Sequence, residues 1–162
     1  MSRQDMFVAR DAKAPDGVRI QYGALCWRQS VSGIEVLLIT SRDTGRWVIP
    51  KGWPMAGLAP EAAAAQEAWE EAGVRGVVDP VCLGRFGYLK CVTPMATVPC
   101  AVAVYSLRVG DLATRFPEMK ERTRQWFSQA EAADLVDESD LRRIIEAFVP
   151  PSKGRAGPIV AE

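Results

Sequence analysis

The sequence contains no histidine among its 162 residues. A Ser-His triad, a histidine general base and a histidine-ligated metal site are therefore all excluded. Any acid–base chemistry must come from Glu, Asp, Lys, Tyr or Cys side chains.

Cysteine is also scarce. The four cysteines, Cys26, Cys82, Cys91 and Cys100, contain no Cys-x-x-Cys pair, which argues against a zinc site. Three of them lie in apolar, strand-like runs, so we expect buried free thiols in a reducing compartment.

Net charge and long apolar runs are missing as well. Twenty basic and twenty acidic residues cancel, so no general polyanion-binding surface is implied, although local basic patches remain compatible with the composition. No apolar run approaches the length of a membrane span. Residues 1–16 mix charges and have no signal-peptide core. These features predict a soluble, cytoplasmic protein with no membrane partner.

The length and the composition, 48% apolar and 25% charged, are typical of one globular domain. We expect a loose N-terminal arm at 1–16, a single domain at 17–149, and a flexible Pro- and Gly-rich tail at 150–162. Helices are predicted at 60–72, at 129–133 after a capping box formed by Ser128 and Glu131, and from 137 or 139 to about 148. The last helix carries an apolar stripe of Leu141, Ile144, Ile145 and Phe148. Strands are predicted at 18–27, 34–40, 47–49, 74–78, 81–83, 85–92, 98–109 and 124–127. Strands on both sides of a central helix predict an α/β fold with a mixed β-sheet packed between helices.

The central helix follows a loop that begins at Gly52. Pro60 suits the first helical position, and Glu61 places negative charge in the first turn, where the helix dipole favours it. Four alanines follow, and alanine is the best helix former. Gly73 is placed to end the helix in a left-handed conformation.

Three carboxylates share one side of this helix. Glu67, Glu70 and Glu71 are spaced i, i+3 and i+4, and like charges at this spacing repel one another. A cation would relieve the repulsion, and hard oxygen ligands suit Mg²⁺ or Mn²⁺. A solvated acidic face on a surface helix is the alternative. The opposite, apolar side is predicted to comprise Ala62, Ala65, Trp69 and Ala72.

The loop and helix together resemble a Nudix box, whose pattern is Gly-x5-Glu-x7-Arg-Glu-(apolar)-x-Glu-Glu-x-Gly-(apolar). The residues at matching positions are Gly52, Glu67, Glu70, Glu71, Gly73 and Val74. The resemblance extends over about 18–148 and implies the Nudix-type α/β/α sandwich with a central catalytic loop-helix. Two positions differ, because Leu58 and Gln66 replace the Glu and Arg that resemble a structural ion pair in the family. Both charges are absent together, so neither is left without its partner.

The resemblance implies a Mg²⁺-dependent hydrolase that cleaves a diphosphate linkage, with Mn²⁺ as a possible substitute. The implied metal ligands are the carbonyl of Gly52 and the carboxylates of Glu67, Glu70 and Glu71. Glu70 is the first choice of general base. Glu121, in a later loop with Glu118, is the second choice.

Other segments narrow the resemblance to one branch. Residues 24–28, 36–41, 45–50 and 124–127 resemble the diphosphoinositol polyphosphate phosphohydrolases and their bacterial relatives, which also cleave dinucleoside polyphosphates. Arginine binds phosphate through a planar fork of donors. The implied substrate-binding residues are Arg19, Arg42, Lys51, Arg122 and Arg124. Trp53 is expected to form a wall of the substrate site, whereas Trp47 is expected in the core.

Two departures favour a nucleotide-type polyphosphate over a highly phosphorylated inositol. Gln21 stands where this branch has a basic residue, and the turn between Arg85 and Thr97 contains only Lys90 in place of a basic, histidine-containing loop. Two alternatives remain open. One is a non-catalytic Nudix-like domain that binds a nucleotide or metabolite and regulates. The other is an RNA 5′-end pyrophosphohydrolase, against which the neutral net charge argues. The sequence leaves open a monomer or a homodimer.

Overall fold

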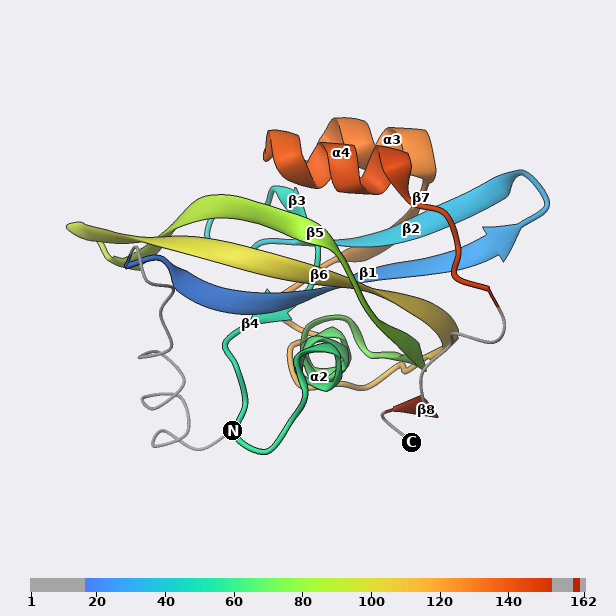
Figure 1. Cartoon of the computed structure of the whole chain (residues 1–162), viewed down its shortest axis with the longest axis horizontal. Coiled ribbons are helices and arrows are strands. Elements are labelled where there is room, and N and C mark those ends of the chain that lie inside the picture. The colour runs from blue at the N-terminus through green and yellow to red at the C-terminus, as the bar shows by residue number, and fades with distance from the viewer. Residues whose placement is uncertain (1–16, 153–158, 161–162) are drawn as a thin grey trace.

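The computed structural model describes residues 17–152 and 159–160. Within these residues, one eight-stranded sheet lies between helix α2 on one face and helices α3 and α4 on the other (Figure 1). The predicted mixed α/β sandwich is confirmed. The predicted N-terminal arm and most of the predicted C-terminal tail lie outside the described residues. The helices are α2 (Pro60–Ala72), α3 (Gln129–Leu135) and α4 (Ser139–Ala147).

The strand order along the sheet is β3-β2-β1-β6-β5-β8, with β4 paired to β1 and β7 paired to β2. β1 and β6 run parallel, and the other described pairs are antiparallel. The strand bounds are β1 (Arg19–Ser30), β2 (Gly33–Thr40), β3 (Trp47–Val48), β4 (Lys51–Gly52), β5 (Val74–Thr93), β6 (Ala96–Leu112), β7 (Arg124–Ser128) and β8 (Ile159–Val160).

Two segments differ from the prediction. The three strands expected between 74 and 92 form a single long strand, β5, whose register shifts between Val78 and Gly84. Pro80 has no N–H to donate to the strand pairing, and Gly84 has a φ of 155°. The strand is irregular between these residues, which interrupts the alternation of apolar and polar residues without ending the strand. Ile159 and Val160, within the predicted tail, form β8 and pair with β5.

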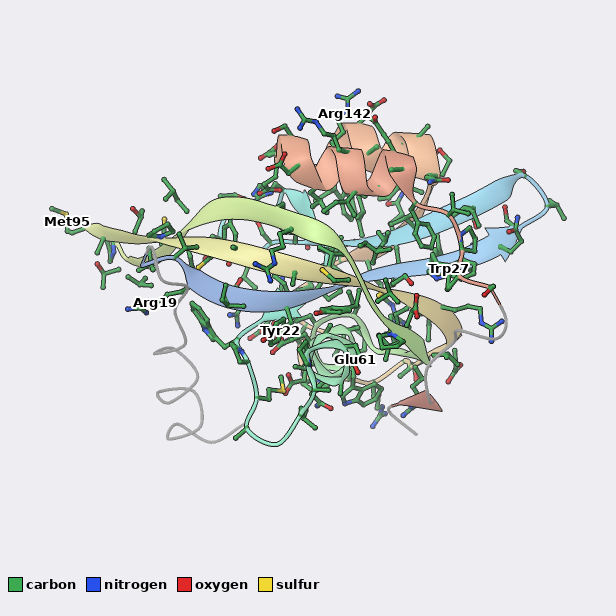
Figure 2. All side chains as sticks on the ribbon, in the orientation of Figure 1. Arg19, Tyr22, Trp27, Glu61, Met95 and Arg142 are labelled. Carbon is green, nitrogen blue, oxygen red and sulfur yellow. The ribbon has the colours of Figure 1, made fainter. Side chains whose placement is uncertain are left out.

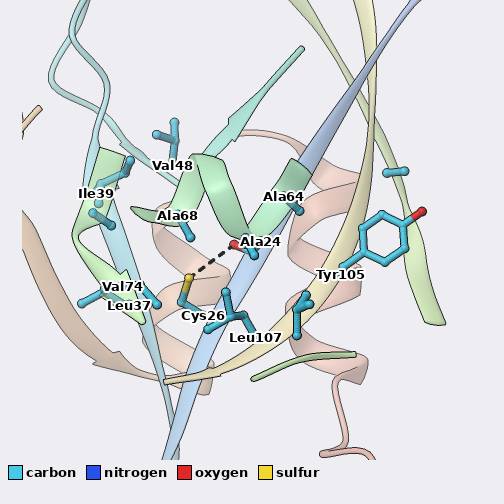
Figure 3. Close-up of a cluster of buried hydrophobic side chains, with 14 residues drawn as sticks. Ala24, Cys26, Leu37, Ile39, Val48, Ala64, Ala68, Val74, Tyr105 and Leu107 are labelled. Atoms are coloured by element: carbon cyan, nitrogen blue, oxygen red, sulfur yellow. Dashed lines mark hydrogen bonds between the residues drawn. The ribbon is translucent and has the colours of Figure 1, made fainter. Parts of the chain in front are cut away.

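The α2 face of the sheet is packed with alanines. Ala64, Ala68 and Ala72 are buried against β-strand side chains such as Leu37 and Leu107 (Figure 3). These short side chains let the helix lie close to the sheet. The predicted apolar face is partly wrong, since Ala62 and Trp69 are only half-buried. Four consecutive alanines give no directional pattern, and the Trp69 ring instead carries the Arg75 guanidinium at 4.5 Å.

The opposite face of the sheet is covered by α3 and α4. Leu141, Ile145 and Phe148 are buried there, as the apolar stripe predicts. The Ser128 hydroxyl accepts a hydrogen bond from the backbone N–H of Glu131, whose carboxylate accepts one from the backbone N–H of Ser128. This capping box is therefore confirmed. Among the described residues, no helix is long and apolar enough to span a membrane.

The cysteines are all free, but only two are buried. Cys26 lies in the α2-side core, where its thiol contacts the carbonyl oxygen of Ala24 at 3.9 Å (Figure 3), and burial raises its pKa to about 12. Cys100 is also buried. Cys82 and Cys91 are exposed, so the expectation of buried thiols is wrong for these two, which lie on irregular or distal parts of β5 where one face of the strand is open to solvent.

Candidate active site

The loop and helix of the central motif are fixed to the sheet at both ends. At the N-terminal end, β4 pairs with β1, with Gly52 opposite Tyr22. Pro60 begins α2, and Gly73 ends it with a φ of 66° while its N–H donates to the carbonyls of Ala68 and Trp69. The predicted helix bounds and left-handed cap are confirmed. The helix therefore presents its acidic side at a defined position beside β4.

Two of the three glutamates are largely buried. Glu67 and Glu71 are each 8% exposed, whereas Glu70 is half-buried. Burial, followed by the charges of Glu71 and Glu70, raises the pKa of Glu67 to about 9. Burial also raises the pKa of Glu71, against the opposing effect of Arg122 and Lys51. The alternative of a solvated acidic face does not fit this burial.

Gly52 lies in direct contact with the acidic helix. A Cβ at position 52 would collide with the carboxylate of Glu67. The backbone N–H of Lys51 donates to Glu71 Oε1 at 3.3 Å. The start of the loop and the two buried carboxylates therefore form one compact unit.

Basic side chains stand opposite the glutamates. Arg122 is 8% exposed at its side chain, and its Nη2 lies 3.4 Å from Glu71 Oε2 while its Nε lies 2.9 Å from Glu118 Oε1. Arg122 Nη1 also donates to the carbonyl of Thr40 at 3.1 Å. The Lys51 ammonium lies 4.9 Å from the Tyr88 ring centroid, and burial lowers its pKa.

These residues line a cleft of about 510 Å³ that combines acidic and basic walls. Such a mixture suits a ligand whose negative charges are shared between cations and a bound metal ion. The charged and aromatic residues that line it are Arg42, Asp43, Lys51, Trp53, Glu67, Glu70, Glu71, Tyr88, Lys90, Glu118 and Arg122.

The donor set fits Mg²⁺ as an ion that keeps part of its water shell. Among residues 17–152 and 159–160, no three acidic or cysteine side chains converge into a ready-made metal cage. Glu67 and Glu71 do converge beside β4, since the Glu67 carboxylate lies against Gly52 and the Glu71 carboxylate accepts a hydrogen bond from the backbone N–H of Lys51. Mg²⁺ is typically held by one or two carboxylates, with waters and substrate phosphates completing its shell. The two buried carboxylates of Glu67 and Glu71, with the more exposed Glu70 beside them, match that arrangement.

Three predicted residues lie outside the cleft lining. Arg124 donates from Nη1 to the Ala72 carbonyl and from Nη2 to the Ala113 carbonyl, each at 2.7 Å. It thereby satisfies a free carbonyl at the C-terminus of α2, and it does not line the cleft. Arg19, at the start of β1, and the exposed Glu121 also do not line the cleft.

The cleft contains residues that the sequence assigned no role. Tyr88 donates from its hydroxyl to Gln21 Oε1 at 2.6 Å, which joins β5 to β1 inside the cleft. Lys90 lies with its ammonium 5.9 Å from the Trp53 ring centroid. Glu118, rather than Glu121, faces the site. The alternation along 86–90 could have grouped Tyr88 with Lys90, but only tertiary structure brings them to Gln21 and Trp53.

The fold and this cleft define an α/β/α protein in which carboxylates of one helix face a basic wall. The model of the NUDIX domain matches residues 20–148, so the chain belongs to the Nudix family. The family predicted from the Gly52–Val74 motif is confirmed.

Named relatives match over most of the chain. Nudix hydrolase 16, mitochondrial, of Arabidopsis thaliana is 35% identical over 133 residues, covering 74% of this chain and 73% of the relative. Diphosphoinositol polyphosphate phosphohydrolase 3-alpha of Homo sapiens is 30% identical, covering 75% and 71%. Nudix hydrolase 12, mitochondrial, of Arabidopsis thaliana is 32% identical, and the match spans only 60% of its length.

Solved structures share the fold. An Ap4A hydrolase of C. elegans superposes with a TM-score of 0.58 at 18% identity, covering 80% of this chain and 94% of the other. The dihydroneopterin triphosphate pyrophosphohydrolase of E. coli gives a TM-score of 0.61 at 20% identity, covering 80% and 94%. At these identities the likeness establishes the fold alone.

Proposed function

We propose that the protein is a Mg²⁺-dependent pyrophosphohydrolase that cleaves a diphosphate linkage in a nucleotide-type polyphosphate, such as a dinucleoside polyphosphate. The observation that carries the proposal is the cleft itself, in which the buried pair Glu67 and Glu71 faces Lys51 and Arg122. Hydrolysis of a phosphoanhydride requires that charge on the phosphate oxygens be neutralised and that a water be delivered in line.

The division of roles follows from burial and partners. Glu67, Glu71 and the Gly52 carbonyl would hold the ion, which supplies charge neutralisation and a bound water of lowered pKa. Glu70 is half-buried, lines the cleft and is the first choice of general base. Glu118 replaces Glu121 as the second choice, because only Glu118 lines the cleft.

Two cations are placed to bind phosphate. Arg42 is 56% exposed at its side chain and lies 3.6 to 3.8 Å from the carboxylates of Glu121 and Glu118, so these loose pairs leave it able to turn to a ligand. Lys90 lines the same cleft near Trp53. Arg122 already pairs with two carboxylates, so we assign it mainly to positioning Glu71 and Glu118.

The substrate class rests on what the cleft offers beside its cations. Gln21 is buried and accepts from Tyr88, so this position is neutral where the diphosphoinositol branch has a basic residue. Fewer cations suit a chain of few phosphates better than a highly phosphorylated inositol. Trp53 is only 6% exposed, so it offers a hydrophobic wall rather than a free face on which a base could stack.

A substrate panel tests the proposal. Phosphate or nucleotide release would be measured with Mg²⁺ and with EDTA for diadenosine polyphosphates, ADP-ribose, nucleoside triphosphates, a diphosphoinositol polyphosphate and triphosphorylated RNA. We expect metal-dependent release from the diadenosine polyphosphates above all others. Preferred cleavage of the diphosphoinositol or of RNA would overturn the substrate class, and steep loss of binding with salt would mark RNA.

The regulatory alternative has a distinct outcome in the same assay. The Leu58 and Gln66 replacements are the observation that favours it, because they remove a pair that resembles a brace of the loop. If no member of the panel is cleaved while ADP-ribose or a nucleotide still raises the melting temperature, the protein is a binding domain and the enzymatic proposal fails.

A further inference from the structure

A second hollow, of about 300 Å³, lies away from the cleft. Trp27 of β1, Asp79 of β5 and Ser106 of β6 line it, together with Pro151 from the chain that follows α4, and none of these residues lines the cleft. Figure 2 shows Trp27 toward the opposite end of the sheet from Met95, near the segment that leaves α4.

This hollow is on the α3 and α4 side of the sheet. Trp27 packs in the core cluster of that side, with its ring centroid 5.5 Å from that of Phe148. Ser106 shares its strand face with Val104, which is in the same cluster, because side chains alternate along a strand. The acidic helix α2 covers the other face, so the two sites are separated by the sheet (Figure 1).

Two polar groups in the wall of this hollow are buried without a partner. Trp27 is 6% exposed and Ser106 is 1% exposed. Trp27 Nε1 and Ser106 Oγ have no hydrogen-bond partner within the part of the chain that the structure describes. Buried donors are nearly always satisfied, by protein, water or ligand. The hollow therefore offers hydrogen bonds that the fold itself does not use.

The chemistry of the wall restricts the ligand. The indole N–H of Trp27 can only donate, whereas the Ser106 hydroxyl can donate or accept. Asp79 is 2% exposed and places an acceptor with negative charge beside them. The exposed Arg108 of β6 also lines the hollow and offsets this charge, so the wall has no net charge that would select an anion. The indole, Val77 and Pro151 supply apolar surface. A neutral, flat ligand with an acceptor next to an N–H donor matches this set.

We propose that the hollow binds a nucleobase, presented as a nucleoside, at a site separate from the cleft. Every nucleobase carries an acceptor beside an N–H group on its hydrogen-bonding edge. A volume of about 300 Å³ is at the small end of ligand pockets, which suits a nucleoside. The proposal does not depend on hydrolysis in the cleft.

The indole N–H of Trp27 lies in the wall of the hollow, so its NMR signal reports nucleoside binding there directly. In ¹H–¹⁵N spectra of the ¹⁵N-labelled protein, the Trp27→Phe variant identifies the Trp27 indole signal and Trp53→Phe identifies that of Trp53, which lines the cleft. Guanosine, adenosine, uridine and cytidine would be titrated in EDTA. We expect the Trp27 signal to shift saturably with at least one nucleoside while the Trp53 signal stays in place.

Ser106→Ala is the binding variant and Arg42→Gln, in the cleft, is the matched control. Loss of one hydrogen bond should weaken nucleoside affinity about five- to tenfold in Ser106→Ala and leave it unchanged in Arg42→Gln. If Ser106→Ala fails to fold, Ser106→Thr keeps the hydroxyl and narrows the hollow, and it should weaken binding as well.

Two results would overturn the proposal. A Trp27 signal that no nucleoside moves at millimolar concentration would mean that the hollow holds water only. A shift of the Trp53 signal alone, with affinity unchanged by substitutions at Ser106, would place nucleoside binding in the cleft.

Discussion

The carboxylate of Glu67 occupies the space beside Gly52 in which any side chain at position 52 would stand. Gly52 is not among the glycines with positive φ, so its backbone does not require glycine. The requirement comes from the close approach of the acidic helix. The glycine at the start of the motif therefore determines where one carboxylate lies, and this is a carboxylate that we assign to the metal ion.

Gly52→Ala should displace the Glu67 carboxylate and raise the Mg²⁺ concentration needed for half-maximal activity at least tenfold. The reason is that a metal ion binds more weakly when one of its ligands is moved out of position. The matched control is Gly87→Ala in β5, where a new Cβ would meet only the Cys100 carbonyl at an ordinary 3.6 Å. The measurement is activity against Mg²⁺ concentration. Equal metal dependence in both variants would contradict the role of this contact.

The raised pKa of Glu67 predicts how the stability of the metal-free protein depends on pH. Glu67 titrates near 9 in the folded chain against an ordinary value of 4.5, so between these values only the folded state holds the proton. The melting temperature in EDTA should therefore fall as pH rises from about 5 through 9. Glu67→Gln should flatten this decline, and Mg²⁺ should stabilise the wild-type protein more at high pH. Melting curves measured across this pH range test the predicted decline, and a melting temperature that rises with pH would refute it.

Glu70→Gln should lower kcat by about 10²- to 10⁴-fold, the usual contribution of a general base, with little change in melting temperature. Glu70 lines the cleft, and within residues 17–152 and 159–160 its carboxylate makes no hydrogen bond or ion pair that the substitution would remove. Glu61→Gln, on the first turn of the same helix, is the control and should retain activity. Near-wild-type rates in Glu70→Gln would move the role of base to Glu118.

Arg124 and Arg42 should separate stability from substrate binding. Arg124→Gln removes two hydrogen bonds to the Ala72 and Ala113 carbonyls and should lower the melting temperature by roughly 3–8 °C with KM unchanged. Arg42→Gln removes an exposed cation and should raise KM about tenfold with little effect on melting. Steady-state kinetics and melting curves of both variants test this. A raised KM in Arg124→Gln would restore it to the substrate site.

The sequence predicted the parts of the fold that depend on local patterns. Pro60 and Gly73 mark the ends of α2, and Ser128 with Glu131 marks the start of α3, because capping depends on residues a few positions apart. The continuity of β5 was not predictable, since Pro80 resembles a strand break and only pairing with β6 carries the strand through it.

The acidic side of the cleft could also be predicted from residues close together in the sequence, whereas the basic side could not. Glu67, Glu70 and Glu71 share one helix, so their spacing alone placed them together. Whether an arginine faces the cleft depends on contacts between distant segments. Arg122 reaches Glu71 across the fold, whereas Arg124, two residues later on the chain, turns to the end of α2.

The last prediction concerns the brace that this chain lacks. Leu58 is 44% exposed in the loop, and Gln66 is half-buried on α2, at the positions where the family pattern has Glu and Arg. Leu58→Glu combined with Gln66→Arg should restore a pair of opposite charges. Because the loop side is exposed, we expect a favourable coupling free energy of only about 0.5–1 kcal/mol. The measurement is a double-mutant cycle from denaturant unfolding of the wild type, the two single variants and the double variant.

The cycle separates pairing from incidental effects of each substitution. A coupling that weakens in high salt would identify an ion pair, because salt screens exposed charges. If the double variant is no more stable than the sum of the single changes predicts, positions 58 and 66 do not form a brace in this chain. In that case the Gly52 loop is held by the pairing of β4 with β1 and by the hydrogen bond from the Lys51 N–H to Glu71. Lys51→Pro removes that N–H and should then destabilise the loop, although the added charge pair did not stabilise it.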